Sequence, residues 1–434
     1  MTSPHWAGQV HWAPVRPGGS HTERFNRPMV TYGTPTDPGV EWGVVRHQLR
    51  SVKIVAPSAE GRASGSGVWR ADQFDQKSLL SETALPLHNL QYCDGLPAMQ
   101  VQINLFGDGG YGIGIKMAHV LADAQSLMVF VHSWAANSRK TFNVGEHVSP
   151  VAGPPIFDPA RLDACAAGDI DAPVPDPSLL AEARQLPLHR FNWRGIDDPG
   201  YSPFLIPTTE NSIPAIDGIQ SHVSPSTHLP RPPGQLGFCQ SRNDGSPNIS
   251  RLDALLAHVW AMINRSRGHS HSSEDVFLNF TLGARSRLSL PESFIGSPLF
   301  ITHIRMSGAA AAACLGNTAS QIRNTLQLFT REKMGAMLHD AAHEVSPQRL
   351  WQAFVGTQHT LVTSWLRLQV YQVDFVGSGL RPRYVHAVMP KIDGCVQVMD
   401  PRVDDGEMDV AVYLETEAMQ RLLLEKPLHI SVTM

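Results

Sequence analysis

The residues best placed for chemistry in this 434-residue chain are a histidine and an aspartate four positions apart, His119 and Asp123. A neutral imidazole, with an ordinary pKa near ~6.5, can take a proton from an alcohol or an amine. Asp123 lies just before a predicted helix, where a carboxylate can cap the backbone amides. The spacing alone fits a packed or capping pair as well as a catalytic one, so the surrounding elements must decide.

Other motifs carry weaker chemical signals. Residues 107–112 match the string of a dinucleotide-binding fingerprint, but a strand follows where that site needs a helix, so we predict a plain turn. His339 and His343 are one helical turn apart, as in zinc-binding helices, yet no third ligand is evident. We interpret this pair as a solvated helix face and expect no metal. The five cysteines are far apart and are interpreted as free thiols.

The elements predicted around His119 favour a catalytic role for this residue. Alternating residues of a predicted strand over 111–119 share one face: Tyr111, Ile113, Ile115, Met117 and His119. The predicted helix after it has apolar residues at the spacing of a buried stripe: Leu127, Phe130, Val131 and Trp134. Strand-to-helix junctions expose side chains at a sheet edge, where sites are often built.

The rest of the chain predicts an α/β protein in two halves. We expect a helix capped by Ser250 and ended by Gly268, a helical region over 318–344, and strands near 276–281, 298–305, 369–375, 384–388, 395–399 and 408–414. Sixteen of the 33 prolines fall between Pro150 and Pro233, which disfavours regular sheet there. We therefore predict an N-terminal half over 1–149, a proline-rich crossover over 150–234 with a helix near 177–185, and a C-terminal half over 235–434.

Composition excludes several classes of protein. The formal net charge of −4 gives no basic footprint for nucleic acid. No apolar run approaches the ~20 residues that span a bilayer, and the first residues lack the apolar core of a signal peptide. We expect a cytoplasmic monomer with small-molecule partners.

Several segments, in order along nearly the whole chain, identify a family. They are residues 101–105, 119–123, 252–260, 284–288, 296–298, 363–365, 371–375 and 393–394. Together they resemble the BAHD acyltransferases, and more closely the fungal branch that includes trichothecene 3-O-acetyltransferases. The resemblance implies two chloramphenicol-acetyltransferase-like halves with a channel between them. Acyl-CoA is the implied co-substrate and no bound cofactor is needed. His119 is then the sole base, moving an acyl group, expected to be acetyl, to an alcohol or amine of a small specialised metabolite.

The resemblance also assigns supporting roles. Asp123 is expected to point away from the substrate and to order its loop. Asp374 matches a family aspartate that pairs with an arginine, for which Arg285 and Arg287 are the candidates. Four further positions follow from the motifs: Thr363 and Trp365 at a possible oxyanion or acceptor site, and Gly377 and Gly379 in a loop on the CoA side.

The chain departs from the family pattern in two places. The loop after Asp374 is two residues longer, with Val376 and Leu380 as the extra residues. Residues 4–10 resemble a segment that normally lies further into the chain, so we expect the opening strand and helix to be absent and a sheet edge to be uncovered. These departures leave one alternative, a non-catalytic or damaged member that acts at most as a binding protein. A second alternative is a condensation-type enzyme, which shares the histidine motif and the fold but takes its acyl group from a carrier protein.

Overall fold

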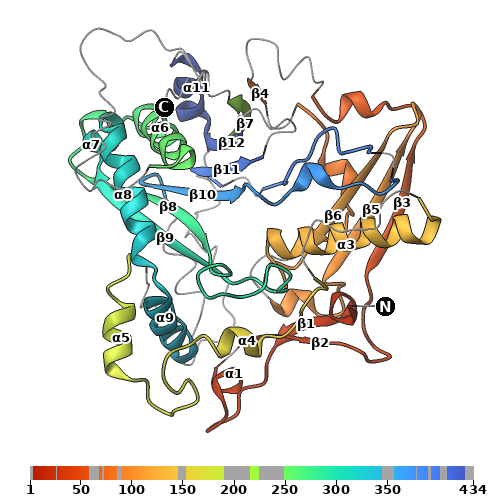
Figure 1. The fold of residues 1–434 in the computed structure, drawn as a ribbon. Helices are drawn as coiled ribbons and strands as arrows, with labels where there is room; N and C mark the ends of the chain where they lie inside the picture. Colours follow the sequence, from red (N-terminus) through yellow and green to blue (C-terminus); the bar gives the residue numbers. More distant parts are fainter. Residues whose placement is uncertain are drawn as a thin grey trace.

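The computed structural model describes residues 3–25, 27–57, 68–70, 73–85, 90–144, 153–189, 216–223, 249–344, 356–377, 379–389, 392–400 and 408–425. Strands and helices interleave along these residues, as the sequence predicts for an α/β protein (Figure 1). The strands form a small three-stranded sheet, a large seven-stranded sheet and a separate antiparallel pair, β1 (Gln9–Trp12) with β2 (Pro28–Thr31).

The small sheet carries the predicted site. Its order is β3 (Glu41–His47), β5 (Met99–Phe106) and β6 (Tyr111–Met117), with β5 parallel to β3 and antiparallel to β6. Residues 107–110 form the plain turn that was expected between β5 and β6. The helix α3 (Ala124–Phe142) lies along this sheet (Figure 1). The connection between β6 and α3, residues 118–123, contains His119.

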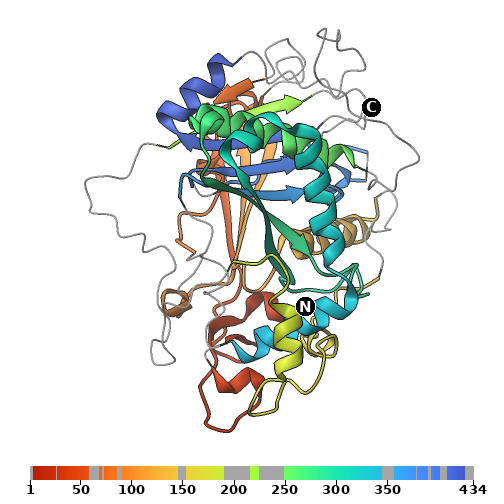
Figure 2. The same cartoon turned by 90° about the vertical axis from the view of Figure 1, so that its left-hand side faces the viewer.

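The large sheet is the core of the second half. Its strands, in order, are β4 (Val68–Arg70), β7 (Ile216–Val223), β12 (Met408–Glu415), β11 (Cys395–Met399), β10 (His359–Trp365), β8 (Asp275–Gly283) and β9 (Leu299–Ser307). One face packs against α6 (Arg251–Ser266), α7 (Gly308–Ala313), α8 (Leu315–Leu328) and α11 (Thr416–Leu424). In Figure 2 the green helix α6 and the teal helix α8 lie in front of the blue strands.

Most predicted elements are present. Ser250 and Asp253 form a capping box at the start of α6, and Gly268 follows its end with φ 81°. The region over 318–344 is two helices, α8 and α9 (Arg331–His343). The remaining α-helices among the described residues are α1 (His21–Arg24), α4 (Ala160–Asp163) and α5 (Pro177–Ala183).

Three expectations about strands are wrong. Residues 369–375 and 384–388 form no strand, whereas β10 lies over residues for which we predicted none. The proline-rich stretch contributes β7, which pairs with β12 over its whole length. β4 comes from the predicted N-terminal half and β7 from the predicted crossover, yet both join the large sheet. The division of the chain at residues 149 and 234 stays a prediction.

The two halves meet where residues 365–375 pack on α3. Buried residues from both segments form one apolar cluster: Met128, Val131, Ala135, Val370, Tyr371 and Val373. The rings of Trp134 and Phe375 lie edge to face at 4.7 Å, and Arg139 donates to the carbonyl of Asp374. No helix within the described ranges is both long and apolar enough to cross a bilayer.

Candidate active site

His119 lies in the turn that joins β6 to α3, two residues beyond the end of the strand, and its side chain is exposed. The backbone N–H groups of Leu121 and Ala122 both donate to the carbonyl of Ala118, at 2.9 and 3.3 Å. These bonds fix the backbone of the turn. The histidine is therefore presented at the edge of the small sheet, as the strand-to-helix pattern predicts.

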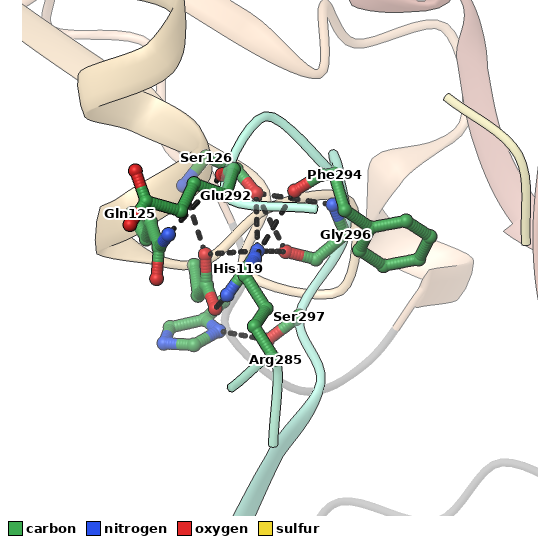
Figure 3. A network of polar contacts seen from close by, with 9 residues as sticks. His119, Gln125, Ser126, Arg285, Glu292, Phe294, Gly296 and Ser297 are labelled. Atoms are coloured by element: carbon green, nitrogen blue, oxygen red, sulfur yellow. Dashed lines mark hydrogen bonds and ion pairs between the residues drawn. The ribbon is translucent and has the colours of Figure 1, made fainter. Parts of the chain in front are cut away.

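A serine from the other half contacts the imidazole. His119 Nδ1 lies 3.3 Å from Ser297 Oγ, in the loop before β9 (Figure 3). When Nδ1–H donates to this hydroxyl, the ring carries its basic lone pair on Nε2. Sequence reasoning missed Ser297: it lies in a motif used for the resemblance, but nothing local indicates which side chain it meets.

Asp123 is buried and forms an ion pair. Its side chain accepts from Arg285 through both oxygens, at 2.5 and 2.9 Å, and it is only 4% exposed. Oδ1 also accepts from the backbone N–H of Ser126 at 2.9 Å, which caps α3 as predicted. The backbone N–H of Asp123 donates to Gly296 at 3.1 Å. Asp123 thus joins the histidine turn to the loop that carries Ser297.

Ser126 and Gly296 complete this connection, which Figure 3 shows as a dense set of dashed bonds. The Ser126 hydroxyl donates to the Gly296 carbonyl at 2.8 Å and accepts from the Gly296 N–H at 3.0 Å. Arg285 donates to the Ser126 hydroxyl and to the carbonyls of Phe294 and Gly296, at 2.8 to 3.1 Å. The residue before Ser297 is therefore held from several directions.

The expected pairing of Asp374 with Arg285 or Arg287 is wrong. Arg285 faces the buried carboxylate of Asp123, which needs a charged partner because it is removed from water. Arg287 donates instead to the carbonyl of Phe329 at 3.1 Å. Asp374 lies near the C-terminal end of α3, where its carbonyl accepts from Arg139.

The carboxylate of Asp374 organises its own loop. It accepts the backbone N–H groups of Val376, Gly377 and Gly379 at 3.0, 2.8 and 3.0 Å. Burial opposes ionisation, but these bonds and Arg139 outweigh it and hold the pKa of Asp374 below its ordinary value. Gly377 and Gly379 have φ of 71° and 74°, a left-handed conformation that favours glycine. Contact of this loop with the CoA side stays a prediction.

Thr363 and Trp365 lie on one face of β10, as alternating strand residues do. Trp365 packs beside the apolar cluster on α3, so it lies where the two halves meet. Thr363 is the register partner of Gln397 in β11. Their roles at an oxyanion or acceptor site stay predictions.

The two histidines of α9 are not a solvated face, which corrects the sequence interpretation. His339 is 1% exposed; its Nδ1 lies 2.9 Å from the carbonyl of Ala167, and its Nε2 accepts from the N–H of Asp176 at 3.0 Å. His343 Nε2 lies 3.1 Å from the carbonyl of Ala172, so both histidines contact the loop before α5. Within the described part of the chain, no three or more His, Cys, Asp or Glu side chains are grouped for a metal ion.

Comparison with known proteins settles the family. The model of the Transferase family matches residues 72–171 and 238–426, well over half of the chain. The chain belongs to the Transferase family. This membership confirms the BAHD resemblance, so the protein is an acyltransferase that moves an acyl group from acyl-CoA to an alcohol or amine.

Individual relatives match most of the chain. The acyltransferase AFT15-1 of Alternaria alternata is 25% identical over 98% of this chain and 84% of its own length. The shikimate O-hydroxycinnamoyltransferase of Nicotiana tabacum is 26% identical over 85% of this chain and 78% of its own. TRI101 of F. graminearum, solved with coenzyme A and deoxynivalenol, superposes with a TM-score of 0.64 at 19% identity, over 97% of this chain and 86% of that one. The superposition confirms the acyltransferase α/β fold.

Proposed function

We propose that this acyltransferase uses His119 as its general base and transfers an acetyl group to a hydroxyl or amine of a small specialised metabolite. The observation that carries the proposal is the orientation of the imidazole. The ring stands at an exposed turn, and Ser297 from the other half faces its Nδ1 at 3.3 Å. Nε2, on the opposite side of the ring, is the nitrogen that we assign as the base.

The reaction follows from this assignment. Nε2 takes the proton of the acceptor hydroxyl or amine as its oxygen or nitrogen attacks the thioester carbonyl carbon. The carbon–sulfur bond breaks when the tetrahedral intermediate collapses, and coenzyme A leaves as a thiolate that takes the proton from the imidazolium. The histidine ends neutral, ready for another cycle. A positioned base of this kind raises the rate by roughly 10²–10⁴.

The remaining site residues act around this base. We place Asp123 and Arg285 as positioning residues, because their ion pair joins the histidine turn to the Ser297 loop. We also place Trp365 beside the reacting carbonyl, where its indole N–H would donate to the oxyanion. We place acyl-CoA and acceptor in a channel between the half that ends near residue 149 and the half that begins near residue 235.

Release of free thiol from acetyl-CoA tests the proposal. Deoxynivalenol, bound in the F. graminearum structure, and shikimate, named for the tobacco relative, are the first acceptors to try. His119→Ala is expected to lower kcat at least ~100-fold. His271→Ala, at an exposed histidine after α6, is the matched control and should leave kcat unchanged. Equal kcat in the two variants would remove His119 from the mechanism.

The donor and the assembly need separate measurements. Comparing acetyl-CoA with an acetylated carrier protein as donor separates a CoA-dependent enzyme from a condensation-type one. We also propose that the protein is a cytoplasmic monomer that binds neither membrane nor nucleic acid. Light scattering on the eluting protein should give the mass of one chain, and twice that mass would contradict the monomer.

A further inference from the structure

A glutamine in the middle of β11 is buried without a hydrogen-bond partner. Gln397 is 1% exposed, and neither its Oε1 nor its Nε2 is hydrogen-bonded. Its neighbours Val396 and Val398 point to the other face of the sheet, into the core beneath the helices. A buried carboxamide that lacks partners lowers the stability of the fold, so its presence in this apolar strand needs a reason.

A small cavity lies beside this side chain. Its wall consists of the segment 384–386 and residues of β11 and β12: Tyr384, Val385, His386, Gln397, Met399, Asp409, Val410 and Ala411. Its volume is about 10 Å³, which is room for one water-sized group. An unpaired amide beside a cavity of this size is the arrangement of a binding site for a single polar group.

The other polar side chains on the wall do not supply the missing partner. Tyr384, His386 and Asp409 are each engaged in other polar or ring interactions. Burial lowers the pKa of His386 to about 4, so this imidazole is neutral at cytosolic pH. The carboxamide of Gln397 is itself neutral and offers both a donor and an acceptor. The matching ligand is a neutral group with the same two capacities, which a hydroxyl provides.

The cavity adjoins the predicted reaction centre. Gln397 pairs in register with Thr363, and Met399 on the cavity wall pairs with Trp365. Val385 lines the cavity and also packs beside the cluster on α3, and its N–H donates to the Tyr371 hydroxyl at 3.2 Å. The cavity thus lies next to Trp365, where the two halves meet.

We propose that Gln397 is a specificity-determining residue that binds one neutral hydroxyl of the acceptor, and that a water molecule takes this place in the substrate-free enzyme. The acceptor part of this assignment rests on the proposed function, whereas the water part does not. The enzyme then selects acceptors that carry a second hydroxyl, separate from the group that receives the acyl chain.

The substrate-free enzyme tests the polar site. A crystal structure should show an ordered water within hydrogen-bond distance of Gln397. The matched control is Gln100 in β5, which is also 1% exposed with both side-chain polar atoms unpartnered. Gln100→Met should raise the thermal midpoint by ~2 °C, because it only removes an unpaired amide. Gln397→Met should give no such gain, because it also removes the partner of the water. An empty cavity together with an equal gain in both variants would overturn the site.

Kinetics test the acceptor role. With the acceptor that supports thiol release, Gln397→Met should raise the acceptor KM at least about tenfold, with a smaller change in kcat and none in the KM of acetyl-CoA. Gln100→Met should change none of these. The analogue without the second hydroxyl should react equally with wild type and Gln397→Met. An unchanged acceptor KM, with the water still bound in the crystal, would overturn the specificity role. If no acceptor reacts with the wild type, the proposed function fails. The crystal structure and the thermal midpoints still decide whether Gln397 binds a water molecule.

Discussion

At the scale of single residues, the candidate active site contains an ion pair that is removed from water. Asp123 and Arg285 are 4% and 5% exposed. Each ion is compensated by the other and by neighbouring polar groups, which include the hydroxyl of Ser126 and the carbonyl of Gly296. Removing one ion of a buried pair leaves the other without compensation, which costs more than the pair itself contributes. The ion pair is therefore a fixed point to which the histidine turn and the Ser297 loop are both attached.

Arg285→Met should be one of the more destabilising single substitutions in this protein. It leaves the Asp123 carboxylate buried and unpaired, so the free energy of unfolding should fall by about 3–5 kcal/mol. The kcat should fall as well, because the loop that places Ser297 against His119 loses its anchor. Urea unfolding followed by circular dichroism measures the first effect, and thiol release measures the second.

A surface arginine is the control for this change. Arg305 pairs with Asp275 at 3.5 Å, and both side chains are largely exposed. Arg305→Met should change stability by less than about 1 kcal/mol. If Arg285→Met costs no more than Arg305→Met, the buried pair does not hold the site together. The double variant Asp123→Asn with Arg285→Met should recover part of the loss, since no charge is then left unpaired.

The sequence predicts the local part of this site and not its partners. His119 and Asp123 lie within five residues, so the strand-to-helix pattern is enough to find them. Arg285 and Ser297 come from more than 150 positions away in the chain. Which arginine reaches which carboxylate is decided by the packing of the halves. The family pattern led to the wrong aspartate for Arg285, which pairs with Asp123 and not with Asp374, and the supporting role of this arginine stays a prediction.

At the scale of elements, two segments that were predicted as strands, residues 369–375 and 384–388, form none. Residues 369–375 alternate like a strand, yet Gln369 has φ 57° and residues 370–372 form a 3-10 turn. Their apolar side chains face α3 instead of a neighbouring strand. In contrast, β10 is central in its sheet and lacks a simple alternation, so the sequence does not reveal it. Helices such as α6 were predictable because their caps and stripes are local.

Asp374→Ala should loosen the loop after this segment without unfolding the protein. Three backbone N–H groups lose the carboxylate that accepts from them. These groups lie near the surface, so water molecules can accept from them instead. If the loop contacts acyl-CoA, the KM of acetyl-CoA should rise by roughly tenfold, with little change in the thermal midpoint. Steady-state kinetics with varied acetyl-CoA measure the effect.

A similar turn elsewhere provides the control. Asp37 accepts from the N–H groups of Gly33 and Thr34 and from the Thr34 hydroxyl, in an exposed turn before β3. Asp37→Ala should change the stability about as much as Asp374→Ala and leave the KM of acetyl-CoA unchanged. The same KM for both variants would show that the Asp374 loop does not serve the CoA side.

At the scale of the whole molecule, buried and half-buried histidines are spread over both halves. Burial lowers the pKa from 6.5 to about 4 in five of them: His5, His258, His303, His359 and His386. They come from the first residues, α6, β9, β10 and the segment beside β11. In the unfolded chain each is solvated and protonates near its ordinary pKa. Between pH 6.5 and 4 the unfolded state therefore binds more protons than the folded state.

The stability should consequently be highest above pH 6.5 and fall on acidification toward pH 4. Each such histidine lowers the free energy of unfolding by up to about 1.4 kcal/mol per pH unit in this window. Urea unfolding across the window measures the total slope. His258→Gln replaces a buried imidazole whose Nε2 has no partner, so it should reduce the slope. His271→Gln changes an exposed histidine and should not. An unchanged slope in His258→Gln would mean that this histidine already takes up its proton in the folded state, near the same pH as in the unfolded chain.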